Sequence, residues 1–185
     1  IYFLANFLVS EHRVMEFQEI DVVVLDIGAD GSAVAEAELF LPPSPYADFL
    51  SYVIRRRGAT AYASDFAEAV RSSFARYGIE VDNILLALDL RNGAKLTASW
   101  SLRGLTRWTE NGWELAFRWP DPKSVAEESL AEEEVSKVMV QSVAEESDYE
   151  HAWFWQFYET RILFPHGAEN IASEVIGETQ RIDYG

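Results

Sequence analysis

The chain has 185 residues, of which 49% are hydrophobic and 14% aromatic, enough apolar material for one sizeable core and too much for a disordered chain. Its formal net charge of −16 argues against nucleic acid and anionic membrane surfaces as partners, because both are bound by clustered lysine and arginine. There is no cysteine, so disulfides, thiolate metal sites and cysteine nucleophiles are excluded.

The first nine residues, IYFLANFLV, form an apolar run that only Asn6 interrupts. Leaving these side chains in water would cost on the order of 10 kcal/mol, so we expect them to be buried. The run is about half as long as a membrane span. Its cover could be the chain's own sheet, a groove on a neighbouring subunit, or a membrane reached through a longer helix. The absent initiator methionine is typical of a processed chain or a fragment.

We therefore expect two parts. Residues 1–13 would be an apolar segment, either a donor strand or the remnant of a hydrophobic helix, and residues 14–185 a single α+β domain.

The domain opens with the pattern of a β-hairpin. Residues 14–27 and 32–41 are rich in β-branched or alternating residues, and Gly-Ala-Asp-Gly at 28–31 supplies the turn. The same stretch superficially resembles a calcium loop. Its third position lacks a carboxylate or amide, and its twelfth is Ala37, so we favour a simple turn.

Two helices are predicted next. The first begins after Ser44, a good N-cap, and ends before Gly58; the second is expected over residues 64–77, with Ser64 as N-cap. Both carry an apolar stripe at helical spacing, which indicates a helical pair packed on one face of a sheet. The stripes are Tyr46, Phe49, Leu50, Val53, Ile54 and Phe66, Val70, Phe74, Tyr77.

From residue 79 the apolar period returns to two. Residues 84–90 and 95–103 are predicted to be strands joined at Asn92-Gly93. Residues 105–119 contain a second hairpin, with Asn111-Gly112 at its turn. We expect these strands to form a meander.

An acidic region, residues 121–150, follows. Its composition predicts a mostly solvated helix, although Val138 and Val140 also fit a short strand. Residues 151–164 have the pattern of a long strand, residues 165–167 that of a turn, and the tail that of one more short strand. The fold class is therefore α+β. It is a mainly antiparallel sheet of hairpins and a meander, open to sandwich-like packing, with a helix pair on one face and a third, acidic helix.

Charged and metal-ligating residues show no recognisable site spacing. His12, His151 and His166 form no HxH or HExxH pattern. For the arginines at 55–57 we favour pairing with the helix C-terminus and with acidic neighbours over anion binding. For the acidic region we favour a solvated face over a cation site. The sequence has no nucleophile elbow, dinucleotide or phosphate-binding motif. We predict no catalytic, cofactor-binding or metal-binding residue, and no cofactor.

Aromatic residues supply the candidate ligand contacts. Core packing is the ordinary role of tryptophans on strands, but some could be platforms for sugar rings. The candidates are Trp108, Trp113, Trp153 and Trp155. A carbohydrate-active enzyme would also need two carboxylates facing one cleft. Nearby in sequence are Glu110, Glu114, Glu150 and Glu159.

The stretch VVVLDIGADGSAVAEAELFLP, together with the later RILFPHGAENI, is similar to parts of extracytoplasmic domains of membrane-anchored surface proteins from archaea. The resemblance is carried by residues 30–33, 165–170 and 183–185, and it extends to the order of the elements. It implies secretion and a role at the cell surface, and it carries over no catalytic residue.

The leading hypothesis is a secreted, extracellular structural subunit that self-assembles into a filament by inserting its apolar N-terminus into a neighbour as an added strand. The contact segment would comprise Ile1, Tyr2, Phe3, Leu4, Phe7, Leu8 and Val9. The alternative is the ectodomain of a surface protein, anchored through a segment absent from this chain, that binds another surface protein or a polysaccharide. A carbohydrate-active enzyme is the third hypothesis.

Overall fold

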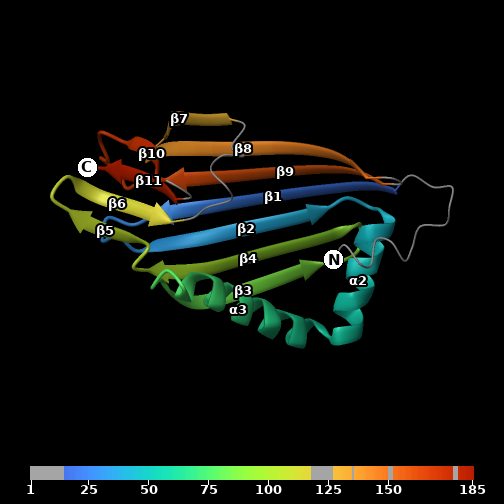
Figure 1. Ribbon diagram of the computed structural model, residues 1–185. Helices are drawn as coiled ribbons and strands as arrows, with labels where there is room; N and C mark the ends of the chain where they lie inside the picture. The colour runs from blue at the N-terminus through green and yellow to red at the C-terminus, as the bar shows by residue number, and fades with distance from the viewer. Residues whose placement is uncertain (1–14, 118–126, 135, 150–151, 177–178) are drawn as a thin grey trace.

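The part of the chain that the structure describes forms two β-sheets and two helices (Figure 1). The computed structural model describes residues 15–117, 127–134, 136–149, 152–176 and 179–185. Within them, the larger sheet has seven strands in the order β3-β4-β2-β1-β9-β8-β7. Their bounds are β1 Met15–Ile27, β2 Ala33–Leu41, β3 Glu80–Asp89, β4 Ala94–Arg103, β7 Glu127–Glu133, β8 Ser136–Tyr149 and β9 Ala152–Leu163.

The smaller sheet has four strands in the order β10-β11-β6-β5. Its strands are β5 Thr106–Thr109, β6 Gly112–Phe117, β10 Ala172–Ile176 and β11 Thr179–Tyr184; the helices are α2 Pro45–Arg57 and α3 Ala59–Ala75. Every paired strand in the described residues is antiparallel to its neighbour except β1 and β9, which are parallel. The expected α+β class with a mainly antiparallel sheet is confirmed.

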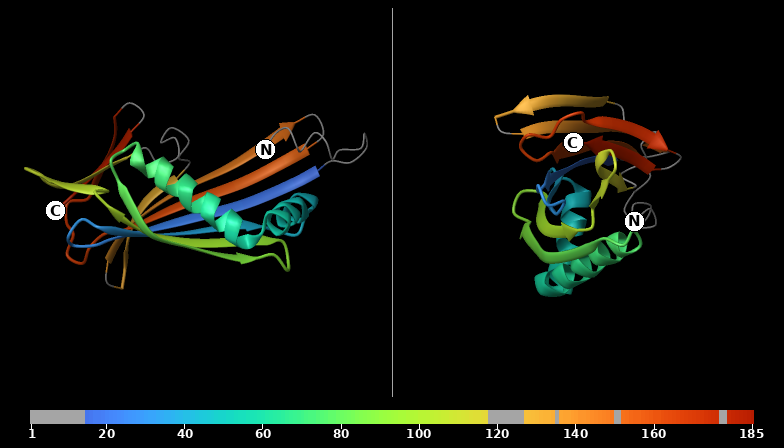
Figure 2. Two further views of the ribbon diagram at one scale, coloured as in Figure 1. Left: turned by 90° about the horizontal axis from the view of Figure 1, so that it is seen from below. Right: turned by 90° about the vertical axis from the view of Figure 1, so that its left-hand side faces the viewer.

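Helices and small sheet cover the same face of the large sheet. Leu25, Ala35 and Trp100 are register partners across β1, β2 and β4, so their side chains share one face. At one end of this face Leu25 belongs to the same buried cluster as Ile182 of the small sheet, and at the other Trp100 packs against Phe66 of α3. Figure 2 shows this arrangement from two further directions.

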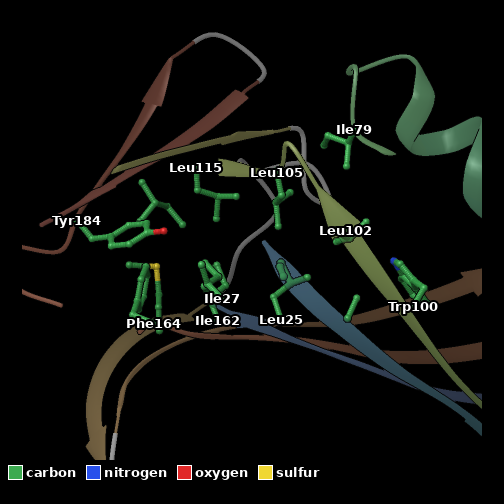
Figure 3. Packing of buried hydrophobic residues seen from close by; sticks show 14 of the residues in the cluster. Leu25, Ile27, Ile79, Trp100, Leu102, Leu105, Leu115, Ile162, Phe164 and Tyr184 are labelled. Atoms are coloured by element: carbon green, nitrogen blue, oxygen red, sulfur yellow. The ribbon is translucent and has the colours of Figure 1, made fainter. Parts of the chain in front are cut away.

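The main core lies between the two sheets (Figure 3). Its largest side chains are almost completely buried, and each contributes about 1.5–3 kcal/mol relative to exposure. Phe164 and Tyr184 meet edge to face with ring centroids 5.1 Å apart. A second cluster lies beneath α2 and is formed by Leu41, Ala47, Ala94 and Leu96.

The start of the chain's described part follows the prediction. The turn between β1 and β2 is closed by a bond from the Gly28 amide to the Ser32 carbonyl at 2.8 Å. Ser44 caps α2, since its Oγ accepts from the Ala47 amide at 3.2 Å, and the Gly58 amide donates to the Ile54 carbonyl where the helix ends. Both predicted limits of α2 are confirmed.

The predicted start of the second helix is wrong. Helix α3 begins at Ala59, so Ser64 lies in its interior and Gly58 is the residue before it. The alanine-rich stretch 59–63 has high helix propensity, and one glycine both ends α2 and starts α3. Tyr77 lies beyond the helix, exposed, with the Arg76 guanidinium 5.1 Å from its ring centroid, so it is not part of a buried stripe.

The predicted acidic helix is also wrong where the structure describes the region. Residues 127–133 and 136–149 form β7 and β8, and β8 is paired on both sides, with β7 and with β9. Complete main-chain pairing and burial of Val138 and Met139 outweigh the modest helix preference of glutamate and alanine.

The expected meander does not form. Both Asn-Gly hairpins are present, as β3–β4 and β5–β6, but β4 pairs with β2, and the chain passes into the small sheet after Gly104, whose φ is +80°. The strand at 151–164 and the turn after it are confirmed as β9 and residues 165–168. The tail forms two paired strands rather than one.

A β-bulge sets which side chains of β3 face the core. Asp82 pairs with Ser101 and Leu85 with Ser99, so Asn83 and Ile84 oppose Trp100 alone. Asn83 takes up the irregularity with a φ of +53°, a conformation that asparagine tolerates better than most residues. The extra residue allows Val81 and Ile84 both to face inward.

We expect Asn83→Ala to lower the free energy of unfolding by about 1 kcal/mol, because alanine has no local hydrogen bond to offset the left-handed conformation. The control is Asn83→Gly, which relieves that cost and should stay within about 0.5 kcal/mol of wild type. Urea denaturation measures both. Equal losses in the two variants would contradict a conformational role for this residue.

Candidate functional site

Two of the four candidate tryptophans are brought together. Trp108 and Trp113 are register partners across the β5–β6 hairpin, with ring centroids 5.4 Å apart and ring planes at 79°. Such edge-to-face pairs contribute about 0.5–1.5 kcal/mol. Trp113 is partly buried against the core, whereas Trp108 is 68% exposed. The hairpin therefore presents one open indole supported by a second.

Trp113 is held in place by the β1–β2 turn. Gly31 has a φ of +78°, and a Cβ there would lie 2.5 Å from both the Trp113 ring and Thr106 Oγ1. Thr106 Oγ1 donates to the Gly31 carbonyl at 2.8 Å. Only glycine fits this close approach. The backing of Trp108 is thus built from three separate elements, β1–β2, β5 and β6.

The same turn is closed by its own side chains. The Asp30 carboxylate accepts from Ser32 Oγ at 2.6 Å and from the Ser32 amide at 3.0 Å, and these bonds lower the pKa of Asp30. In the described part of the chain, no group of three or more histidine, cysteine or acidic side chains is arranged to hold a metal ion. The turn interpretation therefore accounts for what residues 28–32 do.

The Gly31 contact can be tested by comparing two Gly→Ala substitutions. Gly78 also has a positive φ, +74°, but a Cβ there would meet nothing within 4 Å. Gly78→Ala should cost only the conformational strain of about 1–2 kcal/mol. Gly31→Ala should lower the free energy of unfolding by about 3–4 kcal/mol and shift tryptophan emission, because Trp113 must move. Similar losses in both would show that the contact is not tight.

The other predicted contacts are placed only in part. Trp153 and Trp155 lie on β9, opposite Glu16 and Gln18 of β1, and their side chains lie outside the described residues. So does the whole apolar segment at positions 1–9. His166 is exposed in the turn after β9, while His12 and His151 lie outside the described residues.

Two of the four carboxylates near the tryptophans form ion pairs. Glu114 is 4% exposed and accepts from Arg107 Nε at 2.6 Å, and Arg181 Nε lies 2.9 Å from its other oxygen. Glu159 is on the other sheet and lies 3.4 Å from Arg161 Nε. Glu110 is exposed at the tip of the hairpin, and Glu150 lies outside the described residues. Glu114 therefore acts in the structure as a support for two arginines.

Of the arginines at 55–57, Arg57 has the expected acidic partner, whereas Arg55 and Arg56 donate to neutral groups. Arg55 donates to the Leu90 carbonyl at 2.8 Å, and Arg56 donates to the Tyr52 hydroxyl at 3.1 Å. Arg57 forms an ion pair with Asp65 of α3, which lowers the pKa of Asp65. Arg56 and Arg57 thus have partners within the helical pair, and Arg55 binds the segment that follows β3.

Sequence reasoning missed a further surface, the free outer side of β3. Both β3 and β7 are terminal strands of the large sheet. Strand β7 carries four glutamates in seven residues, and one of them, Glu128, accepts from Gln141 and Gln180 at 3.3 and 3.4 Å. Strand β3 has no charged residue between Asp82 and Asp89, and Leu85 in that interval is 68% exposed. The two edges are therefore protected very differently.

Comparisons with protein-family models, with curated proteins and with solved structures find no match for this chain. Within the described residues, no helix combines the length and apolar character that crossing a bilayer requires.

Proposed function

We propose that the protein is an exported structural subunit of the cell surface that self-assembles by strand addition, with the apolar residues 1–9 of one copy lying along β3 of the next. The observation that carries this proposal is the contrast between β7, which carries four glutamates, and the uncharged, partly exposed interval Asn83 to Leu88 of β3 at the other end of the same sheet. The surface location rests on the resemblance of residues 30–33 and 165–170 to archaeal extracytoplasmic domains.

Strand edges are normally protected because unpaired main-chain groups accept any extended partner. Charged side chains are a common protection, and β7 has it. On β3 the five residues Ile84 to Leu88 have none, and within the described chain no strand pairs with their outer side. An edge left open in this way is suited to receive a strand.

The proposed donor matches the acceptor in length and polarity. Nine residues face the ten of β3, and apolar side chains alternate to both sides of the donor, with Phe3 and Phe7 on one and Leu4 and Leu8 on the other. Main-chain hydrogen bonds would supply the affinity, and the alternating side chains would fix the register of the two strands. A contact between two different parts of the same chain is heterologous, and it builds a filament when the rotation between successive copies does not close a ring.

A pair of leucine substitutions tests the acceptor. Leu85→Lys introduces a charge on β3, and Leu130→Lys introduces the same charge on β7, where Leu130 is 52% exposed. We expect wild type and Leu130→Lys to form fibres in negative-stain images at high concentration, whereas Leu85→Lys and a chain lacking residues 1–9 stay monomeric by light scattering.

Single particles of wild type at high concentration, or equal behaviour of the two lysine variants, would contradict strand addition at β3. If residues 1–9 instead cover their own domain, their deletion lowers the melting temperature without changing the oligomeric state.

The exposed Trp108 favours one alternative, a surface domain that binds neutral polysaccharide through the Trp108–Trp113 pair. An indole left 68% exposed and supported from behind suits stacking against a sugar ring, and the charge of −16 disfavours an anionic polymer.

For this alternative, we expect mannan or hydroxyethylcellulose in a native gel to retard wild type and Tyr52→Ala, a control at another exposed aromatic residue, but not Trp108→Ala. The substitution should cost about 1 kcal/mol of stability at most, since it removes a surface contact. Equal migration of all three proteins with and without polysaccharide would exclude the alternative.

A further inference from the structure

Helix α3 packs less deeply against the large sheet than α2 does. None of the seventeen residues of α3 is buried, whereas α2 buries Ala47, Ser51 and Ile54. The apolar side chains of α3 that touch the core, Phe66, Val70 and Phe74, are only partly buried. A helix held in this way can be displaced with little loss of packing.

A polar group without a partner lies directly beneath this helix. Trp100 of β4 is 8% exposed and packs against Phe66 and Phe74, with ring centroids 6.5 and 6.3 Å away. Its indole Nε1 is buried, and no acceptor for it exists in the part of the chain that the structure describes. Buried donors are nearly always paired, so an unpaired one needs an explanation. Figure 3 shows Trp100 on the side of the core nearest α3, apart from Phe164 and Tyr184.

A glycine lies close to each end of α3. Gly58 and Gly78 flank the helix with φ values of +89° and +74°, and nothing lies within 4 Å of the place where a side chain would start. At the N-terminal end of α3, Arg57 of α2 pairs with Asp65 of α3 across Gly58, and both side chains are about half exposed. Hinges of moving elements are a few loop or element-terminal residues, often small ones, so Gly58 and Gly78 are candidate hinge residues for α3.

The core residues beside Trp100 on β3 and β4 are apolar. The bulge in β3 sets Ile84 beside the position of Trp100, and Leu86 and Ala98 continue the surface on the same face. A ligand at this position would contact hydrocarbon side chains and a single hydrogen-bond donor of the protein, Trp100 Nε1. A peptide does not fit this chemistry, because its many main-chain groups would be left unpaired.

We propose that α3 is the lid of a binding site for a molecule with a single acyl chain, whose carbonyl oxygen accepts the hydrogen bond of Trp100 Nε1 while the chain lies between α3 and strands β3 and β4. A long-chain fatty acid and its neutral monoester share this chemistry. This site is independent of residues 1–9 and of the outer side of β3.

The test uses the full chain carrying Leu85→Lys, so that assembly does not interfere, and 11-(dansylamino)undecanoic acid as a fluorescent probe. We expect saturable binding of the probe and its displacement by monoolein or by oleic acid. The stronger of the two competitors shows whether the site prefers the neutral ester or the acid. Trp100→Phe keeps an aromatic ring but removes the donor, and should weaken binding about five- to tenfold. Trp108→Phe, the same change on an exposed tryptophan, should leave it unaltered.

Hydrogen exchange gives a second readout that needs no variant. Amides of α3 should exchange faster than those of α2 in the free protein, and monoolein should slow them selectively. Absence of saturable probe binding, equal affinity of Trp100→Phe and wild type, or α3 exchange unaffected by either lipid would each overturn the proposal. Should Trp100→Phe fail to fold, the exchange experiment alone decides.

Discussion

The parallel pairing of β1 with β9 is the constraint on which the rest of the structure depends. It joins the first described strand to one more than a hundred residues later, from Met15 opposite Ala152 to Asp26 opposite Leu163, and places Leu25 beside Ile162 in the core. Two parallel strands need a long connection between them. Here that connection contains both helices and the β5–β6 hairpin, and all of them pack on one face of the large sheet. A single pairing thus decides which face is covered.

This arrangement also explains where the protein offers surfaces for binding. The large sheet ends in β3 on one side and in β7 on the other, and within the described residues no strand pairs with their outer sides. Glutamates protect the edge of β7, whereas β3 has no charged residue between Asp82 and Asp89 and carries a bulge at Asn83. The same bulge supplies Ile84 to the region around Trp100. One irregular residue therefore influences both the free edge and the seat of the helix.

Much of the local structure could be predicted from the sequence, because it is specified by a few adjacent residues. Ser44 and Gly58 define α2, and the two Asn-Gly pairs define hairpins, whatever surrounds them. The Trp108–Trp113 pair belongs to the same class, since a short turn dictates which residues lie opposite.

What could not be predicted depends on partners far away in sequence. Nothing near β4 indicates that it pairs with β2 rather than β5, and the glutamates of β7 favour a helix until β8 is present beside them. The exposure of Leu85 and the missing acceptor of Trp100 are of this kind too. Leu85 points away from the core because its neighbours Ile84 and Leu86 face inward, and whether Trp100 Nε1 has an acceptor depends on the elements that pack over it, so no short stretch of residues encodes either.

The pairing of β1 with β9 also has a consequence for biosynthesis. Because β1 is made before β9, the edge of β1 that pairs with β9 lacks this partner until the strand that begins at Ala152 has left the ribosome. At about 5–20 residues per second, that delay is on the order of 10 s. Throughout it, the nascent chain displays a β-branched strand ready to pair with any other extended segment, and contacts so distant in sequence form slowly even afterwards. Successful maturation of this protein therefore requires that its earliest strand be kept from premature association while translation finishes.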